Sequence, residues 1–144
     1  MRANPPPGFP VIGINGMKIQ KGHLFFTNLF QGTLCKIPID PRTGGSTGPV
    51  KVITTNVFGA DDFALDSSGT PYVAVFPSNK LVAVKPTGEV VDIAGDIVGP
   101  TSAAFGRNED DRKTIYVTTS GFSFGPSGVT PVEGGRVVAV KRRR

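Results

Sequence analysis

The sequence predicts an all-β fold made of propeller blades. Glycine and proline account for 19 and 13 of the 144 residues, which is too frequent for long helices. No stretch keeps a 3.6-residue apolar period, whereas short runs of alternating or β-branched apolar residues recur between turn residues. A pattern of four such runs repeats at intervals of roughly 40 to 50 residues, which is typical of β-propeller blades.

Each copy of the repeat begins with a polar residue four positions before an apolar residue of its first strand. These polar residues are Asn15, Asp61 and Thr101, which are 46 and 40 residues apart. In a propeller the first strand of each blade lines the central channel, so we expect these side chains at the channel mouth. The expected blades cover about residues 11–57, 58–97 and 98–141, between a proline-rich linker, 1–10, and a basic tail, 142–144.

The first blade is expected to contain four strands. Lys21 and Gly22 form a turn between the first two, and the run from Asp40 to Gly45 has the composition of a longer loop. The expected strands are Asn15–Gln20, His23–Asn28, Thr33–Ile39 and Val50–Ile53.

The second blade contains the clearest hairpin, with a turn at Ser67-Ser68-Gly69. Asp61 and Asp62 stand directly before its first strand. Carboxylates are poor strand formers and are costly to bury unpaired, so their placement needs a reason. The expected strands are Phe63–Asp66, Tyr72–Val75, Leu81–Lys85 and Glu89–Ile93.

The third blade is expected to lack its outer strand. Its three strands are Gly99–Gly106, Thr114–Thr119 and Arg136–Val140, with a loop from Ser120 to Gly135 before the last. Closed propellers typically have 4 to 8 blades, so the three expected blades amount to half of a six-bladed ring. Such a chain forms an open arc, one half of a dimeric ring, or a truncated gene product.

Charge and hydropathy argue against several classes of partner. The net charge is +5, but Lys141 to Arg144 supply four of these charges and the rest of the chain carries about +1, so no basic stripe suits nucleic acid. No apolar run approaches the roughly 20 residues that span a bilayer. The first ten residues lack the apolar core of a signal peptide, so the default expectation is a cytoplasmic protein.

The single cysteine and the single histidine are weak signals for catalysis. Cys35 lies on an expected strand, has no partner for an internal disulfide, and is expected to pack as a small apolar residue. His23 begins the second expected strand, away from the channel mouth, and is expected at the surface.

Three motifs in order resemble a known family. They are Asn15-Gly16 before a hairpin, the run from Asp61 to Ala74, and the run from Gly99 to Gly106. Together they are similar to consecutive blades of the gluconolactonase, regucalcin (senescence marker protein) and luciferin-regenerating enzyme family. The resemblance covers about residues 11–141 and is to the C-terminal half of a six-bladed propeller, in forms common in filamentous fungi.

The resemblance implies a divalent cation, Ca²⁺, Mg²⁺ or Mn²⁺, held by oxygen ligands in the channel. The family's asparagine and aspartate ligands match Asn15 and Asp61, and the aspartate is implied to act also as general base in lactone hydrolysis. Two features depart from the family: Asp62 stands where it prefers glycine, and the blade that carries its glutamate ligand is absent. Without the resemblance, Asn15 is equally a turn residue, Asp61 a backbone acceptor and Asp62 a hydrogen-bonded neighbour.

Three functions are consistent with these features. The first is a metal-dependent lactone hydrolase acting on a small molecule, with Thr101 lining the substrate pocket or serving as a structural hydroxyl. The second is a metal-independent cyclase or pericyclase of fungal natural-product biosynthesis. The third is a non-catalytic half-propeller, with a homodimer as one way to complete the ring. The segment Phe122–Gly125 is either a cover over the channel mouth or a loop without function.

Overall fold

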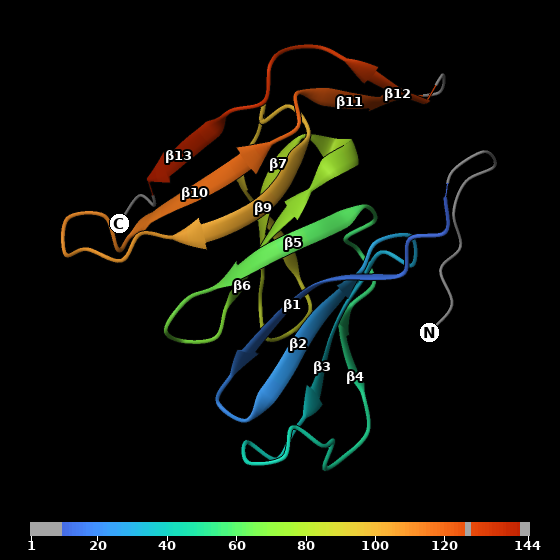
Figure 1. Cartoon of the computed structure of the whole chain (residues 1–144), viewed down its shortest axis with the longest axis vertical. Helices are drawn as coiled ribbons and strands as arrows, with labels where there is room; N and C mark the ends of the chain where they lie inside the picture. Colours follow the sequence, from blue (N-terminus) through green and yellow to red (C-terminus); the bar gives the residue numbers. More distant parts are fainter. Residues whose placement is uncertain (1–9, 126–127, 142–144) are drawn as a thin grey trace.

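The computed structural model describes residues 10–125 and 128–141 and shows three antiparallel blades side by side (Figure 1). The first blade has the order β1 (Ile14–Gln20), β2 (His23–Asn28), β3 (Thr33–Pro38), β4 (Lys51–Thr54). The second has the order β5 (Ala60–Leu65), β6 (Pro71–Val75), β7 (Lys80–Val84), β8 (Val90–Ala94). The third has the order β9 (Pro100–Phe105), β10 (Thr114–Thr119), β13 (Val137–Lys141).

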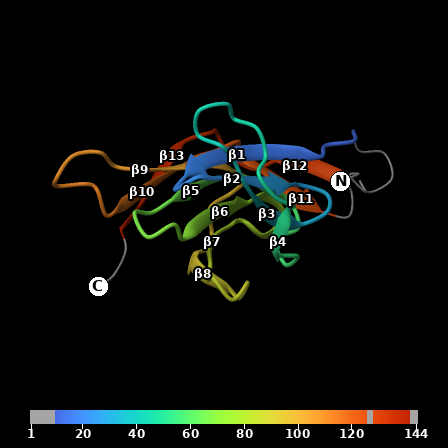
Figure 2. The ribbon, with the colours of Figure 1, turned by 90° about the horizontal axis from the view of Figure 1, so that it is seen from below.

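This arrangement confirms the predicted fold class. Two blades have four strands and the third has three, in the predicted sequence of inner to outer strands. Seen from below, β1, β5 and β9 lie toward one side of the molecule, and the outer strands β4 and β8 lie on the opposite side (Figure 2). A single 3₁₀ turn, η1 (Phe76–Ser78), follows β6. No helix in the described residues has the length and hydropathy needed to cross a membrane.

The prediction of a loop from Ser120 to Gly135 is wrong in part. It contains a hairpin of two short strands, β11 (Phe122–Gly125) and β12 (Gly128–Pro131), which pair from Phe122 opposite Pro131 to Gly125 opposite Gly128. Each strand has only four residues, and their glycine and proline content hides them among turn signals. Residues 1–9 of the expected linker 1–10 and the whole basic tail, residues 142–144, lie outside the described residues.

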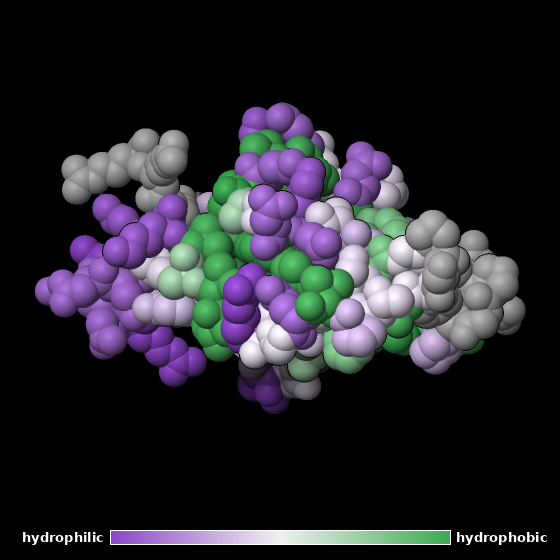
Figure 3. All heavy atoms as spheres, turned by 90° about the horizontal axis from the view of Figure 1, so that it is seen from above, coloured by the Kyte–Doolittle hydropathy of each residue, from purple (hydrophilic) through white to green (hydrophobic). Residues whose placement is uncertain are grey.

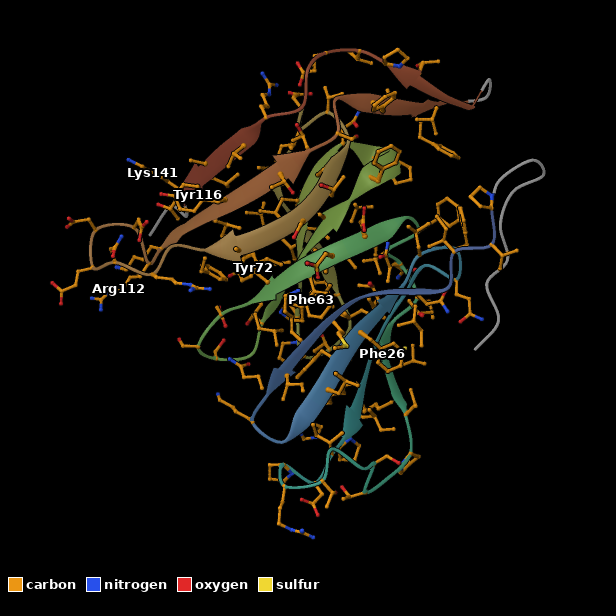
Figure 4. The ribbon with its side chains drawn as sticks, viewed as in Figure 1. Phe26, Phe63, Tyr72, Arg112, Tyr116 and Lys141 are labelled. Carbon is orange, nitrogen blue, oxygen red and sulfur yellow. The ribbon has the colours of Figure 1, made fainter. Side chains whose placement is uncertain are left out.

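The core consists of two apolar layers, one on each side of the second blade. Because side chains alternate along a strand, β6 sends Val73 and Val75 toward the first blade and Tyr72 toward the third. Phe63 is fully buried in the first layer, and the Tyr72 ring meets that of Phe105 edge-on at 5.4 Å in the second (Figure 4). The sequences of the central strands of the second blade, β6 and β7, are therefore almost continuously apolar, because both faces of the blade are covered.

The outer faces of the arc remain apolar and exposed. On β1, Met17 and Ile19 are 61% and 65% exposed, whereas Gly16, Lys18 and Gln20 face the second blade. Seen from above, a hydrophobic area lies between β11, β12 and β13, beside the polar turn that joins β9 to β10 (Figure 3). A further blade is what normally covers such faces in a propeller.

Cys35 packs in the interior, as the sequence indicates. It is fully buried, and its Sγ lies 3.6 Å from Thr33 Oγ1. Burial raises the pKa of its thiol, while the hydrogen bond with the Thr33 hydroxyl acts in the opposite direction. A buried thiol of this kind is inert rather than nucleophilic.

Candidate functional site

The structure brings Asn15 and Asp61 into direct contact. Asn15 Nδ2 donates a hydrogen bond of 2.7 Å to Asp61 Oδ1. Both residues lie where strand pairing is irregular, between Ile14 and Met17 in β1 and between Ala60 and Phe63 in β5. Irregularities of this kind re-aim side chains and are common beside functional sites. The two side chains predicted to share the channel mouth thus meet across two blades.

The carboxylates belong to β5 rather than preceding it. The expected strand began at Phe63, but β5 begins at Ala60 and includes Asp61 and Asp62 in its irregular part. The peptide groups here are held by Thr27, which is fully buried. Its hydroxyl donates to Asp61 O at 2.7 Å and accepts from Gly16 N at 2.9 Å, so β1, β2 and β5 are locked together.

Gly16 permits the close approach of β1 to β5. A Cβ atom at this position would lie 2.5 Å from Asp62 Oδ1 and 2.7 Å from Asp62 Cα. Any larger residue would push the two strands apart, so the Asn15-Gly16 pair has a packing reason as well as a candidate chemical one.

Asp62 links all three blades. Its Oδ1 accepts a hydrogen bond from Lys18 Nζ at 2.5 Å, and its Oδ2 accepts one from Ser102 Oγ at 2.9 Å. Lys18 Nζ also lies 5.2 Å from the centre of the Phe63 ring. The sequence analysis did not predict this network. A signal was present, because Gly16, Asp62 and Ser102 directly follow Asn15, Asp61 and Thr101 and therefore occupy equivalent positions in the three blades. Asp62 is therefore a hydrogen-bonded structural neighbour of Asp61.

Thr101 forms contacts within its own blade. Its hydroxyl lies 2.9 Å from Thr118 Oγ1 and 3.2 Å from Thr118 O. No hydrogen bond among the described residues joins it to Asn15 or Asp61, which fits the structural alternative stated for this hydroxyl.

Asp61 also lines an apolar pocket of about 190 Å³. The aromatic and aliphatic side chains around it come from loops, from the 3₁₀ turn η1 and from the β11–β12 hairpin, and they include Leu29, Phe30, Phe58, Phe76, Phe124 and Val129. Asp61 is the one ionisable residue among the described residues of this lining. One feature of the sequence could have predicted part of this pocket. Phe30 and Phe76 are 46 residues apart, which is also the spacing of Asn15 and Asp61, so the two phenylalanines occupy equivalent positions in the first two blades.

The surroundings raise the pKa of the Asp61 carboxyl above its usual value. Burial is the main cause that raises the pKa of its carboxyl, and the charge of Asp62 adds to this effect. The hydrogen bond from Asn15 acts in the opposite direction. A carboxyl in an apolar pocket beside a like charge is a recurrent arrangement in acid–base sites.

The donor set fits a divalent cation in kind but not in number. Asn15 and Asp61 contribute hard oxygen atoms, whereas Ca²⁺ takes 6 to 8 oxygen ligands. Within residues 10–125 and 128–141, no group of three or more histidine, cysteine or acidic side chains is close enough to hold a metal ion. Asp62, the nearest further carboxylate, is paired with Lys18.

Two curated fungal proteins share sequence similarity with the chain. A protein of Sarocladium schorii named "Putative hetero-Diels-Alderase asR5" is 34% identical over 136 residues, covering 81% of this chain and 33% of the relative. A protein of a Phoma species named "Putative hetero-Diels-Alderase" is 32% identical over 119 residues, covering 76% and 33%. The chain thus spans about a third of the length of these relatives.

Solved structures support the fold. A luciferin-regenerating enzyme superposes with a TM-score of 0.69 at 20% identity, over 90% of this chain and 45% of that one. Regucalcin of Agrobacterium tumefaciens, described as a calcium-binding protein, gives a TM-score of 0.62 at 20% identity, over 74% and 37%. The profile of a family described as the SMP-30/gluconolactonase/LRE-like region matches residues 9–121. The chain belongs to this SMP-30/gluconolactonase/LRE-like family.

Proposed function

We propose that this chain forms part of a propeller enzyme that catalyses a hetero-Diels–Alder cyclisation of an apolar small molecule. The observation that carries the proposal is the position of Asp61, whose carboxyl lines a pocket that is otherwise apolar and rich in phenylalanine. The names of the two fungal relatives support the same reaction class.

The pocket suits a reaction that needs orientation more than charge. In a hetero-Diels–Alder reaction a heterodiene and an alkene form one carbon–carbon bond and one carbon–heteroatom bond, and no atom leaves. Aromatic walls such as Phe58 and Phe76 hold the two partners face to face, which converts a slow encounter into a reaction of neighbouring groups. No oxidant or leaving group is required.

Asp61 supplies the polar contact. Asn15 occupies Oδ1, and none of the described residues forms a hydrogen bond with Oδ2. With the carboxyl protonated, Oδ2 donates a hydrogen bond to the carbonyl oxygen of the heterodiene. This contact withdraws electron density from the diene and lowers the barrier to addition of an electron-rich alkene. Asn15 is a positioning residue, because it fixes which carboxyl oxygen faces the substrate.

The test uses the whole chain with a model heterodiene, an α-methylene ketone, and an enol ether, in the presence of a chelator. We expect faster formation of the dihydropyran than in buffer and an excess of one enantiomer. Asp61→Asn keeps the shape of the side chain but cannot donate an acidic proton, so we expect the excess to fall sharply. Asp92→Asn is the matched control, because Asp92 is exposed and paired with Lys80. Racemic product formed at the buffer rate by the wild-type chain would overturn the proposal.

A second candidate is the metal-dependent lactone hydrolase. The direct contact between Asn15 and Asp61 favours it, because both carry oxygen atoms that suit a hard divalent cation. Such a cation, when bound, would polarise the lactone carbonyl and acidify water. In this case Asn15 and Asp61 would hold the cation, Asp61 would accept the proton of the attacking water, and the other ligands would come from blades beyond the three described here.

Calorimetric titration with Ca²⁺, Mg²⁺ and Mn²⁺ separates the two candidates. The hydrolase predicts saturable binding that both Asn15→Ala and Asp61→Asn weaken, and lactone hydrolysis that a chelator abolishes. The cyclisation predicts turnover that is unchanged by the chelator. Binding that neither substitution affects would remove the hydrolase candidate.

We also propose that further blades complete the ring against the exposed face of β1. They belong either to a longer form of the chain or to a second copy, since Met17 and Ile19 present an apolar surface there. Sedimentation of the wild-type chain and of Met17→Lys distinguishes a dimer, which the substitution should dissociate, from a monomer. A monomer with this face solvated at all concentrations would contradict assembly through a second copy.

A further inference from the structure

A second cavity, of about 620 Å³, lies at the opposite end of β1 and β5 from Asp61. It is bounded by the β1–β2 turn, by β3 and β4, and by the turns that follow β5 and β7. In Figure 1 the arrowheads of β1 and β5 point toward this end, whereas Asp61 lies near their starts. Its volume falls within the range of about 300 to 1,000 Å³ that is usual for small-molecule sites.

The lining of this cavity is basic. Four lysines border it, Lys21, Lys36, Lys51 and Lys85, and no carboxylate is among its described lining residues. Lys85 is neutralised by Glu89 at 2.9 Å. None of the described residues forms an ion pair with the other three lysines, of which Lys21 and Lys51 are exposed.

Two of these lysines stand directly opposite each other. In the register of β3 and β4, Lys36 pairs with Lys51, and both border the cavity. Like charges in this arrangement repel and destabilise a sheet. The Nζ of Lys36 also lies 5.9 Å from the centre of the Phe25 ring, which keeps it at the cavity wall. A bound anion would turn this repulsion into attraction.

The carboxylate of the nearby Asp66 forms hydrogen bonds within its own turn. Its Oδ1 accepts hydrogen bonds from the backbone N–H groups of Ser68, Gly69 and Thr70 and from the Ser68 hydroxyl, at 2.5 to 3.1 Å. These bonds hold the carboxylate within the turn after β5, and Asp66 is not among the described residues that line the cavity.

Contacts between the blades fix the walls of the cavity. Gln20 Nε2 donates to Asp66 O at 2.9 Å, and Lys21 Nζ donates to Ser68 O at 3.3 Å. On the other side, the backbone at Gly88 approaches Ile53 so closely that a Cβ atom would lie 2.4 Å from Ile53 O. These contacts hold the walls of the cavity in place, which lowers the entropic cost of binding.

We infer that this cavity binds a small anion that carries two or more phosphate or carboxylate groups. Lys36 and Lys51 supply the central charges, Lys21 supplies a third, and the Thr70 hydroxyl at the facing turn can donate a hydrogen bond. The site is separate from the proposed cyclisation site, and its ligand is either a co-substrate or a regulator.

The test is calorimetric titration of the full chain with pyrophosphate and with citrate at about 0.15 M salt, where exposed charges are screened. We expect one saturable site for at least one of these probes. Comparison of the two distinguishes a phosphate from a carboxylate ligand. The decisive variant is Lys36→Met/Lys51→Met, which keeps the apolar length of both side chains and should weaken binding at least about tenfold.

The matched control is Lys113→Met/Lys141→Met, which removes the same charge from exposed positions outside the cavity. We expect its affinity to stay within about twofold of wild type. Thermal unfolding gives an independent readout: the anion should raise the Tm of wild type, and without anion the Lys36→Met/Lys51→Met variant should unfold at a higher temperature than wild type. No saturable binding by wild type, or equal weakening in both double variants, would overturn the inference.

Discussion

The two inner strands β1 and β5 have chemically different sites at their two ends. At their starts, one carboxyl group, Asp61, lines an apolar pocket of about 190 Å³. At their far ends, several lysines border a larger cavity with no carboxylate among its described lining residues. We propose an apolar ligand with one hydrogen-bond acceptor for the first site and an anion for the second.

This difference arises from where the blades touch. At the start of the strands, Gly16 lets the backbones approach and Asp62 bridges to Lys18 and Ser102, which leaves Asp61 against the apolar loops. At the far end the two blades meet through the amide of Gln20, the amine of Lys21 and the close approach of Gly88 to Ile53, and the lysine-lined cavity lies among these contacts.

The largest expected effect comes from Phe63→Ala, which removes the side chain between the two sites. Phe63 is fully buried, so we expect the free energy of unfolding to fall by about 3–5 kcal/mol, as measured by urea denaturation. Both sites should then lose ligand binding together. Phe58→Ala serves as the comparison, because Phe58 is 45% exposed and should cost less while affecting only the apolar pocket. Equal losses for the two variants would contradict this placement of the core.

A smaller effect is expected from Gly16→Ala. The new Cβ would meet Asp62 at 2.5 Å, and relief of this clash should cost about 1–3 kcal/mol of unfolding free energy. Anion binding at the far end should persist if the two sites are independent. Gly95→Ala is the control, because no atom lies within 4 Å of the position of its Cβ. A stability equal to that of the control would show that β1 and β5 are not held as described.

Lys18→Met should change stability less. The Lys18–Asp62 pair is partly exposed, with side-chain exposures of 35% and 25%, so we expect a loss of about 1 kcal/mol or less, and less again at high salt. Lys80→Met removes the more exposed pair with Asp92 and should cost less still. The measurement is denaturant unfolding at two salt concentrations. A larger loss of unfolding free energy in Lys80→Met than in Lys18→Met would contradict the stronger stabilising role given to the Lys18–Asp62 pair.

The smallest expected effect is the pH dependence that Asp61 confers. Because its pKa is higher in the folded than in the unfolded chain, the folded state binds the proton more tightly. Its contribution to stability is therefore present at low pH and is lost as the pH rises through the folded-state pKa. Relative to Asp61→Asn, wild type should become less stable over that range, by less than about 1 kcal/mol because the half-exposed group is screened. The opposite slope would contradict a raised pKa.

The sequence was sufficient for the blades but not for all of the site. Alternating and β-branched residues specify the strands, and the register of the repeat predicted that Asn15 and Asp61 would meet. The β11–β12 hairpin was missed because each strand has four residues and turn-forming composition. The apolar pocket was missed because loops and that hairpin build it, and their positions depend on tertiary packing rather than on local pattern.

The contrast between Asp61 and Asp62 shows the same limit. The two carboxylates are adjacent in sequence, yet Asp62 pairs with Lys18 and Ser102, whereas Asp61 lines the apolar pocket. Only the positions of the neighbouring blades decide which carboxylate forms the ion pair with Lys18 and which lines the apolar pocket.

The most direct test is a titration of the Asp61 side-chain carboxyl carbon by NMR, in the folded chain and in urea. We expect a pKa in the folded chain above that in urea, and a further rise in Asn15→Ala, because the hydrogen bond from Asn15 stabilises the ionised form. A folded-state pKa at or below that of the unfolded chain would contradict the central claim that Asp61 is poised to hold a proton in the apolar pocket.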